Sequence, residues 1–164
     1  MTGPDNNPRA DQDMKSRLKS GLTSLLSFAL LAMLAYFASI EIKSYLGRQA
    51  LAETGLDPLP LDDALARAKI ENKLVLADMS AIWCATCRKL DKEVFASATV
   101  RKVIDERYIY SRTEYESKEG EAFMQRYSVI GFPTVLILDA DGNKLAQVPL
   151  TFSAEVFAGF LSNP

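Results

Sequence analysis

The sequence predicts an α/β domain in which a mixed central sheet is flanked by helices, preceded by an N-terminal transmembrane helix. Three observations lead to this prediction. The segment 21–40 is apolar and carries no charge. Beyond it, apolar and amphipathic segments alternate in the order βαβ and then ββα, which is typical of a mixed sheet covered by helices. The only two cysteines, Cys84 and Cys87, lie where the first predicted strand gives way to a helix.

The composition fits one globular domain with an appendage, because 48% of the 164 residues are hydrophobic and 24% are charged. The formal net charge is −2. The chain has no strongly basic segment, so no nucleic-acid partner is expected.

The N-terminal region is expected to hold a disordered cytoplasmic tail over residues 1–20 and a transmembrane anchor over residues 21–40. The first residues are polar and contain Pro4 and Pro8. Twenty helical residues span about 30 Å, the thickness of the apolar core of a lipid bilayer. A cleaved signal peptide and a buried soluble helix are alternatives. Cleavage after Ala38 would place Tyr36 at the −3 position, which is unfavourable.

The charges that flank the apolar segment predict its orientation. Four basic residues precede it and two follow it closely, namely Arg9, Lys15, Arg17 and Lys19, then Lys43 and Arg48. The positive-inside rule then places the N-terminus in the cytoplasm and the domain outside it. Such a compartment also suits disulfide chemistry.

Residues 41–59 are expected to form a stalk and linker, helical to about residue 51 and broken by Pro58 and Pro60. The globular domain then covers residues 60–164. Hydrophobic periodicity predicts its elements. We expect helices over 63–70, 86–96, 100–106, 118–127 and 154–161, and strands over 74–79, 108–113, 134–138 and 144–149.

The pair Cys84 and Cys87 has the Cys-x-x-Cys spacing of a dithiol that can close and reopen a small ring. A helix N-terminus lowers the pKa of a thiol and favours the thiolate. A structural disulfide and half of a zinc site are the alternatives. The chain has no histidine and no third cysteine, so no metal is expected, and a loop this short would restrain the unfolded chain little. No cofactor is expected either.

Three separated motifs resemble the thioredoxin superfamily: Asp78, the segment 83–87 and the segment 131–134. The residues 88–95 that follow the dithiol narrow the resemblance to the C-terminal domain of the bacterial transmembrane thiol–disulfide reductase DsbD. The resemblance covers about residues 60–162 and implies a thioredoxin-like fold. Ala85 and Thr86 stand where thioredoxin has Gly-Pro, so its redox potential cannot be carried over.

The resemblance implies roles for residues at the site. Cys84 would be the attacking, more exposed thiol, and Cys87 the resolving thiol. Pro133 matches the family's cis-proline beside the dithiol, which would leave the backbone of Phe132 free to pair with an extended substrate peptide. An ordinary loop is the alternative for this segment.

Two carboxyl groups and one aromatic ring are further candidates. The resemblance implies that Asp78 is a buried carboxylate near Cys87 that exchanges protons with a thiol, whereas a water-facing strand end is the alternative. Asp91 shares a helix face with Cys87 and either tunes the thiols or is a solvated acid. Trp83 either shields the disulfide or packs in the core. The acidic segment 114–121 is expected to be solvated.

The resemblance, together with the apolar segment and its flanking charges, predicts an enzyme in the bacterial inner membrane, with a single transmembrane pass and its C-terminal domain in the periplasm. It would reduce a disulfide-containing protein substrate and be reduced again by an upstream thiol electron donor. A disulfide oxidase or isomerase is one alternative. A non-enzymatic accessory subunit of a membrane complex is another, but docking alone would not require two reactive thiols.

Overall fold

The computed structural model describes residues 8–163. The first element is helix α1 (Pro8–Thr54), and the chain divides into two units between Glu41 and Ile42, inside this helix. Residues 1–7 of the expected disordered tail lie outside the described range, but residues 8–20 are helical. Proline is well suited to a first helical position, and lengthening an existing helix avoids the cost of nucleation.

Within the first unit, the apolar side chains of α1 are exposed, as Leu25 at 69% and Phe28 at 73% illustrate. Among the described residues, one helical segment, Gly21–Thr54, is long and apolar enough to cross a membrane. The predicted apolar helix is therefore present.

The second unit contains a four-stranded sheet in the order β2-β1-β3-β4. The strands are β1 (Leu74–Ser80), β2 (Tyr108–Glu114), β3 (Thr134–Leu138) and β4 (Lys144–Val148). Strand β1 pairs in parallel with β2 and antiparallel with β3, which in turn pairs antiparallel with β4. The mixed sheet that the sequence predicts is confirmed.

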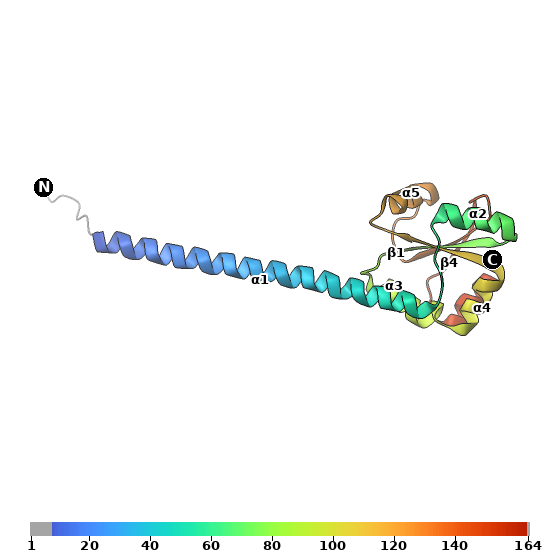
Figure 1. The fold of residues 1–164 in the computed structure, drawn as a ribbon, viewed down its shortest axis with the longest axis horizontal. Coiled ribbons are helices and arrows are strands. Elements are labelled where there is room, and N and C mark those ends of the chain that lie inside the picture. The colour runs from blue at the N-terminus through green and yellow to red at the C-terminus, as the bar shows by residue number, and fades with distance from the viewer. Residues whose placement is uncertain (1–7, 164) are drawn as a thin grey trace. The chain divides into compact units, whose positions relative to one another are not determined.

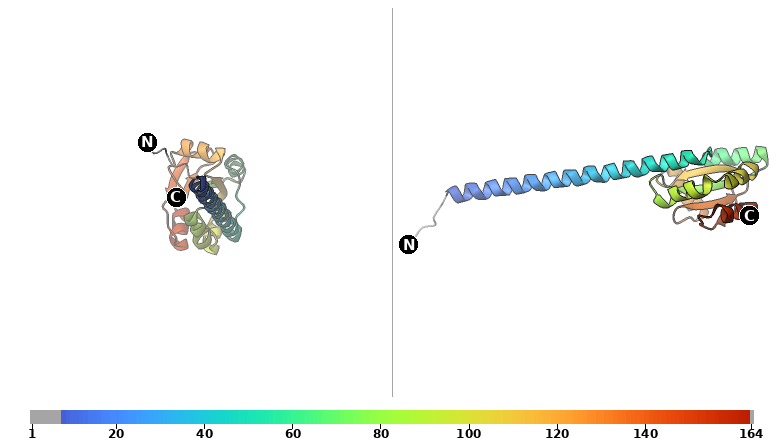
Figure 2. Two further views of the ribbon diagram at one scale, coloured as in Figure 1. Left: turned by 90° about the vertical axis from the view of Figure 1, so that its left-hand side faces the viewer. Right: turned by 90° about the horizontal axis from the view of Figure 1, so that it is seen from below.

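Helices cover both faces of this sheet (Figures 1 and 2). One face carries α2 (Leu61–Glu71) and α5 (Lys118–Tyr127). The other face carries α3 (Ala85–Leu90), the π-helix η1 (Asp91–Phe95), α4 (Ala98–Arg107) and α6 (Ala154–Ser162). The single helix expected over 86–96 is thus two elements, since the N–H of Ala96 donates to the carbonyl of Asp91, five residues back.

Successive side chains of β1 lie on opposite faces of the sheet, so the hydrophobic core is divided into two layers. Val75, Ala77 and Met79 pack under α2 and α5, and Leu76 packs on the opposite face, under η1, α4 and α6. Because side chains alternate across a strand, Asp78 and Ser80 share the face of Leu76. The polar end of β1 is therefore directed toward the layer that contains α3 and η1.

The last turns of α1 belong to this second unit and pack closely on it. Ser44, Ala50 and Thr54 are buried. A Cβ at Gly47 would lie 1.8 Å from the carbonyl oxygen of Ile82, so only glycine allows this approach. The helix ends at Thr54 and is followed by Gly55, whose φ of +65° is the left-handed conformation common after a helix C-terminus.

Candidate active site

The two cysteines lie at the start of α3, directly after the turn that leaves β1. Cys84 is the N-cap residue of α3, and its Sγ accepts the backbone N–H of Cys87 at 3.1 Å. Both thiols are free, with exposed fractions of 8% for Cys84 and 2% for Cys87. The strand, turn and helix that the sequence predicts therefore bring the two sulfur atoms together, with Cys84 the less buried of the two.

The environment of Cys87 disfavours its charged form. Burial raises the pKa of the Cys87 thiol to about 12, and its hydrogen bond with Cys84 adds to the rise. The hydroxyl of Ser80, at the end of β1, lies close enough to the sulfur to lower the pKa in part. Cys87 is thus a protonated thiol at rest that has one polar side chain placed to stabilise a thiolate.

Aromatic rings surround the dithiol. Cys84, Cys87 and Ala81 form a small buried cluster with Trp83 and Phe132 packed against it. The ring centroid of Phe132 lies 5.5 Å from that of Trp83 and 4.6 Å from that of Tyr115. The Phe132–Pro133 peptide bond is cis, as the resemblance implies.

Asp78 is buried, with an exposed fraction of 2%, so the alternative of a water-facing strand end is wrong. Its Oδ2 accepts the hydroxyl of Tyr110 at 3.0 Å and lies 3.3 Å from Nη1 of Arg112. Burial raises the pKa of Asp78 to about 6, because it outweighs the opposing attraction of Arg112. Asp78 is therefore poised to change its protonation state near neutral pH.

Asp91, the first residue of η1, is also buried, with an exposed fraction of 1%, which rules out the solvated alternative. Its Oδ1 accepts a hydrogen bond from Nη1 of Arg112 at 2.8 Å. Burial raises the pKa of Asp91, and Arg112 opposes that rise. Burial would lower the pKa of Arg112, but the carboxylates of Asp78 and Asp91 outweigh it and keep the guanidinium charged.

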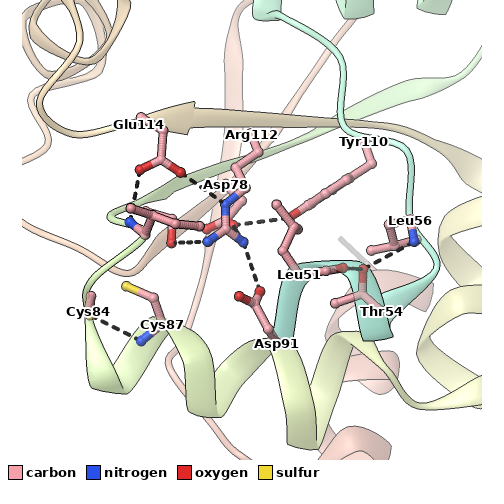
Figure 3. Close-up of polar contacts among 12 residues, drawn as sticks. Leu51, Thr54, Leu56, Asp78, Cys84, Cys87, Asp91, Tyr110, Arg112 and Glu114 are labelled. Atoms are coloured by element: carbon pink, nitrogen blue, oxygen red, sulfur yellow. Dashed lines mark hydrogen bonds and ion pairs between the residues drawn. The ribbon is translucent and has the colours of Figure 1, made fainter. Parts of the chain in front are cut away.

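Arg112 connects the buried carboxylates of Asp78 and Asp91 to the dithiol. Its Nη2 donates to Oγ of Ser80 at 2.7 Å, and Ser80 in turn borders Cys87. Figure 3 shows the guanidinium between the carboxylates of Asp78 and Asp91, with Cys87 on the helix beside them. The polar atoms of the site thus form one connected network from the thiol to the strands.

Glu114 extends the network to the loop before the dithiol. Its Oε2 accepts the backbone N–H of Ile82 at 2.9 Å, and its Oε1 lies 3.6 Å from Nε of Arg112. The side chain of Glu114 is 43% exposed, in keeping with the solvated segment expected over 114–121, but the end of β2 also brings it over the loop at Ile82.

Three residues of the site were not predicted from the sequence: Arg112, Ser80 and Tyr110. A signal was present in β2, where Tyr110 and Arg112 alternate on one face. The parallel register then pairs Arg112 directly with Asp78. Within residues 8–163, no group of three or more His, Cys, Asp or Glu side chains is placed to hold a metal ion.

Comparisons with known proteins agree with this geometry. The thioredoxin-like domain model matches residues 61–163. The thiol:disulfide interchange protein DsbD of Cronobacter sakazakii is 32% identical over 106 residues, which are 63% of this chain and 18% of that protein. DsbD of Escherichia coli is 30% identical over 104 residues, 62% of this chain and again 18% of the relative. The chain thus spans less than a fifth of these relatives.

Two solved structures show the same fold. The C-terminal domain of Neisseria meningitidis DsbD in its oxidised form aligns with a TM-score of 0.53 at 21% identity, covering 61% of this chain and 88% of that one. A thioredoxin from Thermus thermophilus aligns with a TM-score of 0.59 at 21% identity, and the alignment covers 65% of this chain and 85% of the thioredoxin. The sequence match and the dithiol at the strand–helix turn together show that the chain belongs to the thioredoxin-like domain family.

Proposed function

We propose that this protein is a membrane-anchored thiol–disulfide oxidoreductase that reduces disulfide bonds of partner proteins. The observation that carries the proposal is the pair of free thiols at the start of α3, with the Sγ of Cys84 held 3.1 Å from the backbone nitrogen of Cys87. The two sulfur atoms belong to one helical turn, so a disulfide between them needs only a local movement.

The reaction proceeds in two exchanges. The Cys84 thiolate attacks one sulfur of the partner's disulfide, which breaks that bond and releases one partner thiol. Cys87 then loses its proton and attacks Sγ of Cys84, which forms the Cys84–Cys87 disulfide and releases the second partner thiol. Two electrons pass from the dithiol to the partner, and an upstream thiol donor must return them.

The surrounding residues take supporting roles in this proposal. Asp78, whose pKa of about 6 lies near neutrality, accepts and returns the proton of the dithiol. Trp83 and Phe132 cover the sulfur atoms and contact the substrate, which pairs with the backbone beside Pro133. Asp91 tunes the thiols through Arg112.

The direction of electron flow in this proposal, from the dithiol to the partner, depends on the redox potential of the Cys84–Cys87 pair. A redox titration against glutathione tests this point, because a potential well below that of the glutathione couple supports a reductase and one well above it supports an oxidase.

The catalytic roles are tested with a disulfide-containing protein such as insulin and dithiothreitol as the electron donor. Cys84→Ser should abolish the reduction, because the one thiol that remains, Cys87, is buried and protonated. Cys87→Ser should accumulate a mixed disulfide, because the attacking thiol stays bonded to the partner. Equal rates for the wild type and Cys84→Ser would refute the proposal.

The proposed location is the bacterial inner membrane, with a single pass and the C-terminal domain in the periplasm. Support comes from the exposed apolar side chains of α1 and from the excess of basic residues before them. In a variant without cysteines, Lys102→Cys reports on the domain and Asn6→Cys on the N-terminal tail. A membrane-impermeant maleimide should label only Lys102→Cys in spheroplasts, and labelling of only Asn6→Cys would reverse the orientation.

A further inference from the structure

A buried path of polar contacts leads from Cys87 through Ser80 to Arg112. Ser80 is 1% exposed, and its Oγ accepts Nη2 of Arg112 at 2.7 Å. A serine hydroxyl has one proton to donate besides its acceptor lone pairs. Because Arg112 can only donate, the Ser80 proton is left for another acceptor. Ser80 ends β1 on the face that α3 covers, and Cys87 is the buried thiol of α3 that interacts with this hydroxyl.

Arg112 is held so that it cannot turn away from Ser80. Its side chain is only 4% exposed, and its Nη1 lies 2.8 Å from Oδ1 of Asp91 and 3.3 Å from Oδ2 of Asp78. Asp91 follows Cys87 by one helical turn, so the same ion pair ties the helix of the thiol to strand β2. The donor, the guanidinium and the thiol are therefore fixed relative to one another.

We infer that Ser80 is a catalytic hydrogen-bond donor in the second exchange and that Arg112 positions it. This inference rests on the proposed function and refines it. In the mixed disulfide, Cys87 gives its proton to the base of the site, for which Asp78 is the candidate. The Ser80 hydroxyl donates to the resulting thiolate while the Cys87–Cys84 bond forms and the Cys84–partner bond breaks. The partner sulfur leaves as a thiolate and takes up a proton.

The two exchanges are separable with a small aromatic disulfide, dithiobis-nitrobenzoate, as the oxidant. Attack by Cys84 releases one coloured thiolate and leaves the other bonded to Cys84. Attack by Cys87 on Cys84 then releases the second one, in a phase that does not depend on reagent concentration. The assay uses the reduced full-length protein in detergent and needs no natural partner, so it is independent of whether partner proteins are reduced.

The Ser80→Ala variant should leave the first phase within twofold of the wild type and slow the second phase about tenfold. This is the loss expected when a charged group forfeits one hydrogen bond, because one pKa unit changes the thiolate fraction tenfold. Ser80→Thr retains a hydroxyl and should recover most of the second-phase rate. An unchanged second phase in Ser80→Ala, or an equal slowing in Ser80→Thr, would overturn the inference.

Ser111→Ala is the matched control. Ser111 is a fully buried serine on β2, its Oγ has no hydrogen-bond partner among the described residues, and it lies on the opposite face of the strand from Arg112. Neither phase should change. If Ser111→Ala slows the second phase as much as Ser80→Ala does, loss of a buried hydroxyl acts through the fold and the inference fails.

The positioning role of Arg112 is tested in the double variant Arg112→Gln with Asp91→Asn, which removes one cation and one anion together. Its second phase should slow to a similar extent, and adding Ser80→Ala should slow it no further, because both changes remove the same hydrogen bond. An additional tenfold loss in the triple variant would show that Arg112 does not act through Ser80. Failure of the protein to reduce insulin with these phases intact would instead reject the proposed function alone.

Discussion

The Cα of Gly47 lies against the carbonyl oxygen of Ile82, so closely that an added Cβ would come within 1.8 Å of that oxygen. Gly47 belongs to the last turns of α1, and Ile82 is two residues before Cys84. This contact fixes the loop of the dithiol directly on the last turns of α1, which belong to the same unit.

Gly47→Ala should therefore destabilise the protein, although alanine normally favours a helix. The obstacle is a backbone oxygen that cannot rotate away, so the loss should be about 1–3 kcal/mol in the free energy of unfolding, as for overpacked cores. Thermal unfolding of the full chain in detergent measures it. The control is Gly159→Ala in α6, where nothing lies within 4 Å of the added Cβ and stability should hold or rise. A fall for both variants would contradict the contact.

Arg112→Met should cost much of the stability of the domain. The change leaves the buried carboxylates of Asp78 and Asp91 without a cation, and breaking a buried pair in this way costs about 3–5 kcal/mol. Denaturant unfolding measures the loss. Lys102→Met removes a cation whose pair with Glu106 has side chains 75% and 59% exposed, and should change the free energy of unfolding by less than about 1 kcal/mol. Similar losses in both variants would argue against a buried cluster.

The pKa of Asp78 predicts how stability depends on pH. Its ordinary value is 3.8 and the folded value is about 6, so between these values the folded protein binds more protons than the unfolded chain. This contribution therefore favours folding at low pH and is lost as the pH rises through 6. A shift of this size corresponds to roughly 3 kcal/mol.

Asp78→Asn removes that titration. Relative to the wild type, the variant should gain roughly 2–3 kcal/mol of stability between about pH 4 and pH 7, as measured by urea unfolding of the reduced protein. The same substitution at an exposed carboxylate, Asp105→Asn, serves as the comparison. A parallel curve for Asp78→Asn would show that Asp78 ionises normally in the folded state.

Phe132→Ala should make the thiol of Cys84 more reactive toward small reagents. The ring packs on the dithiol cluster and contacts the rings of Trp83 and Tyr115, so its removal opens the approach to a sulfur that is 8% exposed. Alkylation by iodoacetamide, measured in a Cys87→Ser background, should accelerate severalfold. Phe160→Ala, which removes a 40% exposed ring from α6, should leave the alkylation rate unchanged.

Local patterns were sufficient to predict most of the fold. The helix over 118–127 and the strand over 134–138 have the predicted bounds, because their periodicity and turn residues agree with the tertiary structure. The π-helix η1 was not predicted. Its hydrogen bond joins the N–H of Ala96 to the carbonyl of Asp91, five residues earlier, and this spacing depends on packing against the sheet and not on the helix preference of the residues.

The dithiol was predictable because its chemistry lies within four consecutive residues. The cluster beneath it was not, since Arg112 reaches Asp78 and Asp91 only through the pairing of β1 with β2. The same strand pairing shows that Asp91 is a buried acid beside the site and not a solvated one. Spacing places it on the helix face of Cys87, but only the position of Arg112 shows that this face is turned inward.

Trp83 is the only tryptophan in the chain, and it packs on the dithiol cluster. Its indole emission therefore comes from the site alone, with no other indole to dilute the signal. Because sulfur atoms quench a neighbouring excited indole differently as thiols and as a disulfide, the protein contains its own optical reporter of electron transfer, readable in a stopped-flow cuvette without any label.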